Sequence, residues 1–362
     1  MGLWPESNKP GIYTLYSTLT ISLYIIGHLF FQVVNVYFIA HDLASVVATS
    51  FHLLIEFLAA VKSYYIMKNI SILKDRIITF KSDWFQPRSP HQRKLIEPTI
   101  YFWQMIFKVC VCMAYGCNAF WAIYPLIEKS EEKRLPFLAW YPYDYNKSPY
   151  YEITYIYQVI CIGYLTTIHL NVDTLIYAFC VYTSCQFDIL ADNIRNLANV
   201  DDSFTDSVHH NMLKCVEHHK NSLSFIEGST KFFSWILFWH LLVSGVSIGI
   251  SLFQLTTVVP LSSEFYSLVS FINAITLQIF MYCWFGAEVQ TKSENLSYAV
   301  FESDWTDLLK RLKKNLLFFG MHLKPVRISA LNVFYHSLDT YMRIMRTAWS
   351  YFALLYQVSS LA

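Results

Sequence analysis

The chain has 362 residues, of which 55% are hydrophobic, 18% aromatic and 15% charged, and its formal net charge is +1. Soluble domains are about 45–50% apolar and about 25% charged, so this chain is rich in apolar and poor in charged residues. The near-zero net charge excludes a strongly basic protein that binds nucleic acid. The few charged residues are either spread thinly or concentrated between long apolar runs, and their positions along the chain decide between the two.

Seven charge-poor runs are long enough to cross a bilayer, which takes about 20 residues in a helix. The first, fifth and sixth runs contain no charged residue, whereas the second contains Glu56 and Lys62 and the fourth contains Asp173. The sequence therefore predicts an all-α membrane protein with seven transmembrane helices. The predicted spans are 11–40, 43–67, 99–127, 153–187, 232–259, 265–287 and 328–361.

The basic residues outside these spans predict the orientation of the chain. The N-terminus and residues 68–98, 188–231 and 288–327 hold 19 Lys or Arg, whereas 128–152 on the other side holds 4. Short loops rich in Lys and Arg stay in the cytoplasm. The N-terminus is therefore expected to be cytoplasmic and the C-terminus extracellular, the reverse of a G-protein-coupled receptor.

The segments between the spans are not structureless. Residues 188–231 and 288–327 carry apolar side chains at helical spacing, which predicts amphipathic cytoplasmic helices. We expect these helices to pack together as an anchor domain; the alternative is that they lie on the lipid surface. The predicted organisation is 1–187 (spans one to four, with an aromatic outer lid at 128–152), 188–231 (cytoplasmic helical extension), 232–287 (spans five and six), 288–327 (cytoplasmic anchor helix) and 328–362 (span seven).

Three short stretches resemble insect odorant receptors. Residues 140–144 (WYPYD) resemble the second outer loop of that family, 282–286 (YCWFG) resemble the exit of its sixth span, and 350–357 (SYFALLYQ) resemble its last span. The related gustatory receptors end in Thr-Tyr, five residues and Gln-Phe. This chain keeps that spacing but differs at both ends, with Ser350 and Val358.

The resemblance implies a subunit of an odorant-gated, non-selective cation channel. In that family four subunits surround a pore lined by the seventh span, and a tuning subunit binds the odorant and assembles with a common coreceptor subunit. The chain resembles a tuning subunit because 188–231 lacks the coreceptor's long insertion. The expected location is the plasma membrane of olfactory neuron dendrites. The expected partners are the coreceptor, a small volatile apolar ligand, membrane lipid and permeating cations, with no nucleic acid, cofactor or metal.

The resemblance places the pore in the last span. Leu354, Gln357 and Val358 stand at i, i+3 and i+4 and so share one helix face. Two aliphatic side chains and one amide suit a narrow hydrophobic gate with a polar group for a passing ion. The alternative is a stripe that faces lipid or a neighbouring helix.

An odorant site is expected among the outer halves of spans two, three, four and six. A volatile ligand is small and mostly apolar, so its site needs shape and aromatic side chains more than charge. The candidates are Val46, Thr49, Phe51 and His52 in span two; Ala114, Cys117, Asn118 and Trp121 in span three; Thr154, Tyr157, Cys161 and Tyr164 in span four; and Phe271, Ala274 and Gln278 in span six. Each of them could instead contribute to packing.

Ionisable residues within the spans are candidates for a structural, ligand-binding or gating role. His169 and Asp173 stand at i, i+4, as do His52 and Glu56, so each pair can form a hydrogen bond within its helix. Lys62 lies near the cytoplasmic end of its span, where a lysine can extend to the membrane surface.

Other classes of function find less support in the sequence. Residues 245–249 match the GxSxG motif of hydrolases, which requires a strand-to-helix turn, but they lie inside a charge-free span. We interpret them as small residues that let helices approach closely, and we expect no enzyme activity. A G-protein-coupled receptor, a secondary transporter and a gustatory-type homotetramer are the alternatives.

Overall fold

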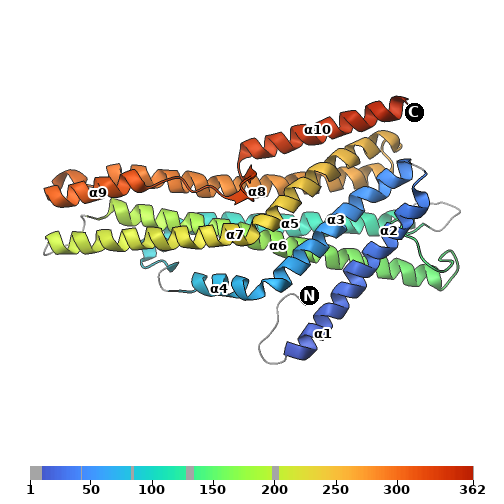
Figure 1. The fold of residues 1–362 in the computed structure, drawn as a ribbon, viewed down its shortest axis with the longest axis horizontal. Helices are drawn as coiled ribbons and strands as arrows, with labels where there is room; N and C mark the ends of the chain where they lie inside the picture. Colours follow the sequence, from blue (N-terminus) through green and yellow to red (C-terminus); the bar gives the residue numbers. More distant parts are fainter. Residues whose placement is uncertain (1–9, 42, 83–84, 128–133, 198–203, 362) are drawn as a thin grey trace.

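The computed structural model describes residues 10–41, 43–82, 85–127, 134–197 and 204–361, and for some helical residues, Phe51 and Val358 among them, it describes only the backbone. Most of the chain is in long helices, of which some follow the long axis of the molecule and others, the N-terminal ones among them, cross it obliquely (Figure 1). They are α1 (Pro10–Ile21), the π-helical η1 (Ser22–Ile26), α2 (Gly27–Ile39), α3 (Leu43–Lys68), α4 (Ile70–Phe80), α5 (Pro90–Ile127), α6 (Tyr150–Arg195), α7 (Phe204–Thr257), α8 (Ser263–Glu302), α9 (Lys310–His322) and α10 (Leu338–Leu361).

The predicted all-α, seven-span architecture is confirmed, with α1, η1 and α2 together forming the first span. By length and composition, five described segments could cross a membrane: Gly11–Ile39, Pro90–Ile123, Tyr150–Arg195, Val208–Thr257 and Phe265–Glu302. The other two, α3 and α10, have 26 and 24 residues and are long enough to cross a bilayer. Within α3, Glu56 and Lys62 are 1% and 0% exposed, whereas Lys68 at its end is exposed. The two charged residues in the interior of α3 are therefore enclosed within the bundle.

Three helices run well beyond the predicted spans. With 46, 54 and 40 residues, α6, α7 and α8 exceed the length that a bilayer requires. Their surplus turns gather with α9 at one extremity, called here the anchor end (left in Figure 1). The predicted boundaries at 187/188, 231/232 and 287/288 fall inside these helices, so no linker separates the parts there.

The amphipathic helix α9 packs against its neighbours. Its apolar side chains Leu312, Leu316 and Phe319 are buried, and Gly320 approaches Val300 of α8. Packing, rather than lying on a lipid surface, therefore accounts for its apolar stripe. The helix begins at Lys310, after a 3-10 turn at Trp305–Asp307.

The last helix starts ten residues later than predicted. The sequence gives span seven as 328–361, but α10 begins at Leu338, and β1 (Ser329–Ala330) and β2 (Phe334–Tyr335) form an antiparallel hairpin before it. Leu331 and Asn332 in its turn have positive φ values of 51° and 58°, which a helix cannot accommodate. The Leu331 N–H donates to the Ser234 hydroxyl of α7 at 2.6 Å, so tertiary contacts stabilise the hairpin.

The small residues of the GxSxG match do bring two helices together. A Cβ on Gly249 of α7 would lie 2.8 Å from the Tyr351 Cβ and 3.0 Å from the Ala348 carbonyl oxygen of α10. The two helices therefore touch backbone to backbone at this point. No strand-to-helix turn exists there, because α7 is continuous from Phe204 to Thr257.

Candidate ligand-binding site

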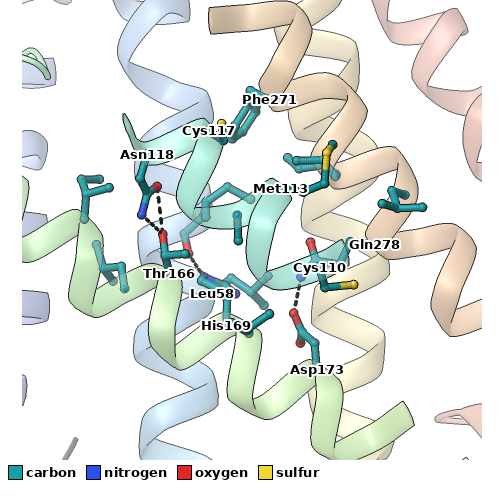
Figure 2. Close-up of a pocket in the computed structure, with 18 of the residues that line it drawn as sticks. Leu58, Cys110, Met113, Cys117, Asn118, Thr166, His169, Asp173, Phe271 and Gln278 are labelled. Atoms are coloured by element: carbon teal, nitrogen blue, oxygen red, sulfur yellow. Dashed lines mark hydrogen bonds between the residues drawn. The ribbon is translucent and has the colours of Figure 1, made fainter. Parts of the chain in front are cut away.

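A cavity of about 170 Å³ lies inside the bundle between α3, α5, α6 and α8, with one side chain, His240, from α7. Figure 2 shows its walls: Cys110, Met113 and Cys117 of α5 face Phe271 and Gln278 of α8. Most of the lining is aliphatic, aromatic or sulfur-containing. A mostly apolar chamber with a few polar groups is the usual form of a site for a small organic ligand.

Aromatic rings close one side of the cavity. The His52 ring lies 4.3 Å from the Phe137 ring, 5.0 Å from the Trp121 ring and 5.9 Å from the Phe271 ring, measured between centroids. Trp121 and Phe137 are stacked at 5.5 Å. These contacts join α3, α5 and α8 to Phe137, which precedes α6 in the chain. They form a rigid apolar wall of the kind that recognises shape.

Phe137 belongs to an extended segment, residues 134–149, called here the lid segment. The Gln158 side chain of α6 accepts a hydrogen bond from the Phe137 N–H at 3.0 Å and donates one to the Phe137 carbonyl, also at 3.0 Å. The Trp140 N–H donates to the Phe31 carbonyl of α2 at 3.1 Å. The described part of the predicted outer lid is therefore folded against the helices.

The opposite end of the cavity is built from buried charges. The Lys62 ammonium of α3 lies 2.5 Å from the Asp173 carboxylate of α6, and both side chains are almost completely buried. The Gln278 amide and the Tyr282 hydroxyl of α8 also donate to Asp173. His169 lies 3.2 Å from the Lys62 nitrogen. This group, called here the buried polar cluster, ties α3, α6 and α8 together (Figure 2 shows His169, Asp173 and Gln278).

A second buried carboxylate lies beside the cavity. Glu56 Oε1 is 2.6 Å from His28 Nδ1 and accepts a hydrogen bond from the Gln32 amide at 2.9 Å. Its partners therefore come from α2, not from His52 on its own helix as the i, i+4 spacing suggested. His169 likewise contacts Lys62 and the Ile55 carbonyl of α3. In both cases a partner on another helix replaces the neighbour one turn away.

The environment of Lys62 differs from the one that the sequence suggested. The sequence suggested a lysine that extends to the membrane surface, but the side chain is 0% exposed and paired with Asp173. The pair is 111 residues apart in the chain, so sequence spacing cannot reveal it.

The structure brings many of the predicted ligand residues together around this cavity. They come from spans two, three and six: His52, Ala114, Cys117, Asn118, Trp121, Phe271, Ala274 and Gln278. Asn118 exchanges two hydrogen bonds with Thr166, of 2.8 and 3.0 Å, so both groups are satisfied within the wall. Val46 and Thr49 are not among the lining residues, and the Thr49 hydroxyl bonds the Ser45 carbonyl. The Phe51 side chain lies outside the described residues.

The four candidates from span four lie on another face of α6. The Tyr157 hydroxyl donates to the Leu23 carbonyl, Tyr164 lies beside Tyr24, and Thr154 bonds the Tyr143 hydroxyl of the lid segment. Cys161 is fully buried on that same face, which packs against the first span. The cavity is instead lined by Ile162, Leu165, Thr166, His169, Leu170, Asp173, Thr174 and Tyr177. In the sequence, the ionisable residues His169 and Asp173 are the signal that could have identified the cavity-lining face of α6.

A family model described as 7tm Odorant receptor matches residues 42–349, which is most of the chain. The chain belongs to the odorant receptor family.

Individual odorant receptors from insects are similar along much of the sequence. Odorant receptor Or1 of Anopheles gambiae is 26% identical over 303 residues, covering 75% of this chain and 72% of the relative. Odorant receptor 13a of Drosophila melanogaster is 28% identical over 264 residues, covering 66% and 62%. Odorant receptor 22b of the same species is 24% identical over 219 residues, covering 60% and 55%. The matches thus cover between about half and three quarters of these relatives.

The fold is that of a solved odorant receptor. The insect olfactory receptor OR5 from Machilis hrabei superimposes with a TM-score of 0.86 in its complex with eugenol and 0.85 without it. The sequence identity is 16%, and the alignment covers 98% of this chain and 92% of OR5. The family consists of receptors, so the chain is not an enzyme, and the family match favours the odorant receptor over the alternatives raised by the sequence.

The predicted pore residues of this odorant receptor lie in the last helix. In Figure 1, α10 runs along one edge of the molecule. Its inner face packs on α7 through the buried Ile344 and Ala348, whereas Leu354 is 59% exposed and Gln357 is also exposed. The Val358 side chain lies outside the described residues.

No group of three or more His, Cys, Asp or Glu side chains within the described residues could hold a metal ion.

Proposed function

We propose that this odorant receptor is the odorant-binding subunit of a heterotetrameric, odorant-gated, non-selective cation channel that also contains coreceptor subunits. The observation that carries the proposal is the largely apolar cavity between the helices in a chain of this family. A small volatile binds in it, and the ligand contacts include His52, Trp121 and Phe271, with Ala114, Cys117, Asn118, Ala274 and Gln278 around them.

The lid end of the bundle faces the exterior in this proposal. The 19-to-4 distribution of basic residues supports a cytoplasmic anchor end and an extracellular C-terminus. Residues 188–231 and 288–327 then form the anchor shared between subunits, and the chain acts at the plasma membrane of olfactory neuron dendrites.

The pore is formed by α10 from each subunit. The exposure of Leu354 and Gln357 at the edge of the molecule supports this assignment, because a pore between subunits is lined by side chains on the outer surface of each subunit. Ligand binding is transmitted through α7, which contributes His240 to the cavity and contacts α10 at Gly249.

The decisive experiment is to express the chain in cells with and without a coreceptor subunit and to record currents while a panel of volatiles is applied. We expect odorant-evoked cation current only when both subunits are present. Current from this chain alone would favour a gustatory-type homotetramer. An absence of current in both cases, with surface expression confirmed, would contradict the channel proposal.

The role of Gln357 can be tested separately from ligand binding. Replacement by alanine removes the amide dipole from the proposed pore stripe, so Gln357→Ala should change the relative permeability of monovalent and divalent cations. The half-maximal odorant concentration should stay within about twofold. Reversal potentials under bi-ionic conditions measure the first quantity. A changed odorant preference with unchanged permeability would place the residue outside the pore.

A further inference from the structure

The polar groups on the cavity wall differ in whether they have a hydrogen-bond partner. Asn118 and Thr166 bond each other, and Asp173 accepts from Lys62, Gln278 and Tyr282. His240 of α7 is different: it lines the cavity and is 1% exposed, yet neither ring nitrogen has a partner among the described residues. A buried polar group without a partner is costly, and such a group at a binding site requires an explanation.

The surroundings of His240 do not supply the missing partner. Its ring centroid lies 4.8 Å from that of Tyr282, so the two rings pack against each other. The Tyr282 hydroxyl and the Gln278 amide both donate their hydrogen bonds to the Asp173 carboxylate. The neighbouring donors of the buried polar cluster are therefore already in use. Because His240 lines the cavity, a ligand bound there can supply the missing partner.

The chemistry of an imidazole defines that partner. A neutral imidazole has one N–H donor and one acceptor nitrogen, and a hydroxyl group can both donate and accept. Most of the remaining wall is apolar or aromatic, and Asn118, Thr166 and Asp173 are hydrogen-bonded within it, so the remainder of the ligand is expected to be hydrocarbon. An engineered cavity of about 150 Å³ holds benzene, which makes the 170 Å³ here suitable for a molecule of about that size.

We propose that the cavity selects a small alcohol or phenol, with the ligand hydroxyl hydrogen-bonded to His240 and its hydrocarbon part against the His52, Trp121 and Phe271 wall. The inference rests on the proposed function, since it names the ligand class for that site. It places the polar recognition group on α7, the helix that also contacts the last helix at Gly249.

The test uses pairs of probes in which a hydroxyl replaces a methyl group: benzyl alcohol with ethylbenzene, and 1-hexanol with heptane. Half-maximal concentrations are measured in cells that express the chain with a coreceptor subunit. His240→Phe should raise the value for the alcohols about tenfold, which corresponds to one hydrogen bond, while leaving the hydrocarbons within about twofold. His240→Gln keeps a donor and an acceptor and should retain most of the alcohol sensitivity.

Two control variants separate this role from others. His219→Phe removes another buried histidine of α7, which packs on Phe319 at the anchor end, and should not alter the ratio between the two probe classes. Glu56→Gln alters the other carboxylate beside the cavity; its Oε2 has no partner among the described residues. An alcohol-specific shift in Glu56→Gln and not in His240→Phe would overturn the assignment to His240.

The remaining outcomes are also decisive. If His240→Phe changes the response to alcohols and hydrocarbons equally, the histidine has a packing or water-binding role and the inference is wrong. If no volatile of either class evokes current from the wild-type pair despite surface expression, the proposed channel function fails, and the inference fails with it.

Discussion

The ion pair between Lys62 and Asp173 is buried inside the helix bundle of this receptor. Its two partners differ in how many further hydrogen bonds they make. Asp173 also accepts hydrogen bonds from Gln278 and Tyr282, whereas the Lys62 ammonium has, among the described residues, only His169 in addition. Removing one partner of a buried pair is strongly destabilising because the other charge is left uncompensated.

We predict that Asp173→Leu destabilises the fold by about 3–5 kcal/mol and that Lys62→Met costs less, because the carboxylate keeps two neutral donors. The double variant should recover most of the loss, since both charges are then absent. Melting temperatures of detergent-solubilised receptor, followed by size-exclusion fluorescence, measure this.

The matched control is the half-exposed Arg195–Glu302 pair at the anchor end, where the nitrogen and oxygen lie 2.5 Å apart. Glu302→Gln should cost less than about 1 kcal/mol, because water screens that pair. Equal losses for Asp173→Leu and Glu302→Gln would contradict the importance of burial.

The predicted ligand residues that line the cavity and those that do not differ for a physical reason. His52, Trp121 and Phe271 line the cavity, because the depth of a residue along a span follows from counting residues. Counting residues along a span does not determine which face of the helix points into the cavity when all its faces are apolar. In α6, residues on nearly every side of the helix are buried. The Tyr157 face therefore could not be distinguished from the His169 face by periodicity alone.

At the scale of whole helices, the contact of α7 with α10 depends on the absence of a side chain. Any Cβ at Gly249 would meet the α10 backbone, so the two helices can approach this closely only with glycine there. The sequence indicated this use of small residues.

We predict that Gly249→Ala destabilises the receptor by about 1–3 kcal/mol through overpacking, even though alanine favours helix formation by up to about 1 kcal/mol. Gly116→Ala on α5 is the control, because a Cβ there meets nothing within 4 Å. Its melting temperature should stay the same or rise slightly. If the two variants behave alike, the α7–α10 contact does not depend on close approach.

The start of α10 and the hairpin before it could not be predicted from local sequence. Residues 328–337 are apolar enough to continue a span, and the turn at Leu331 and Asn332 exists because Ser234, distant in sequence, bonds its backbone. By contrast, the helical spacing of apolar residues after 187 predicts a helix there, and α6 continues to Arg195. Local periodicity determines where helices continue, and tertiary contacts determine where this one begins.

At the scale of the whole molecule, the anchor end is joined to the cavity by continuous helices and contains a buried histidine that makes stability depend on pH. His218 of α7, outside the predicted spans, is buried, and its Nε2 lies 3.0 Å from Gln186 Oε1 of α6. Burial, together with the nearby charge of Arg88, lowers the pKa of His218 to about 4. The neutral imidazole is therefore the form that the folded anchor end accommodates.

We predict that acid weakens the receptor through this residue. An unfolded histidine takes up a proton near pH 6.5 and the folded one only near pH 4, so stability is fully present above pH 6.5 and is lost as the pH falls toward 4. At pH 5 the loss is about 2 kcal/mol. Melting temperatures at pH 7 and pH 5 should differ more for wild type than for His218→Gln, which does not titrate. An equal pH dependence would show that other groups are responsible.

The Lys62–Asp173 pair also constrains how the chain enters a membrane during synthesis. Isolated lysine or aspartate at the centre of a helix opposes insertion by about 2.5–3.5 kcal/mol, and α3 carries both Glu56 and Lys62. The partners of Glu56, His28 and Gln32, have been synthesised before it, but Asp173 follows Lys62 by 111 residues. At about 5–20 residues per second, the ribosome needs roughly 6–20 seconds to supply that carboxylate. During this interval α3 has to remain beside the insertion machinery or in contact with water, until α6 arrives and the two helices can partition together.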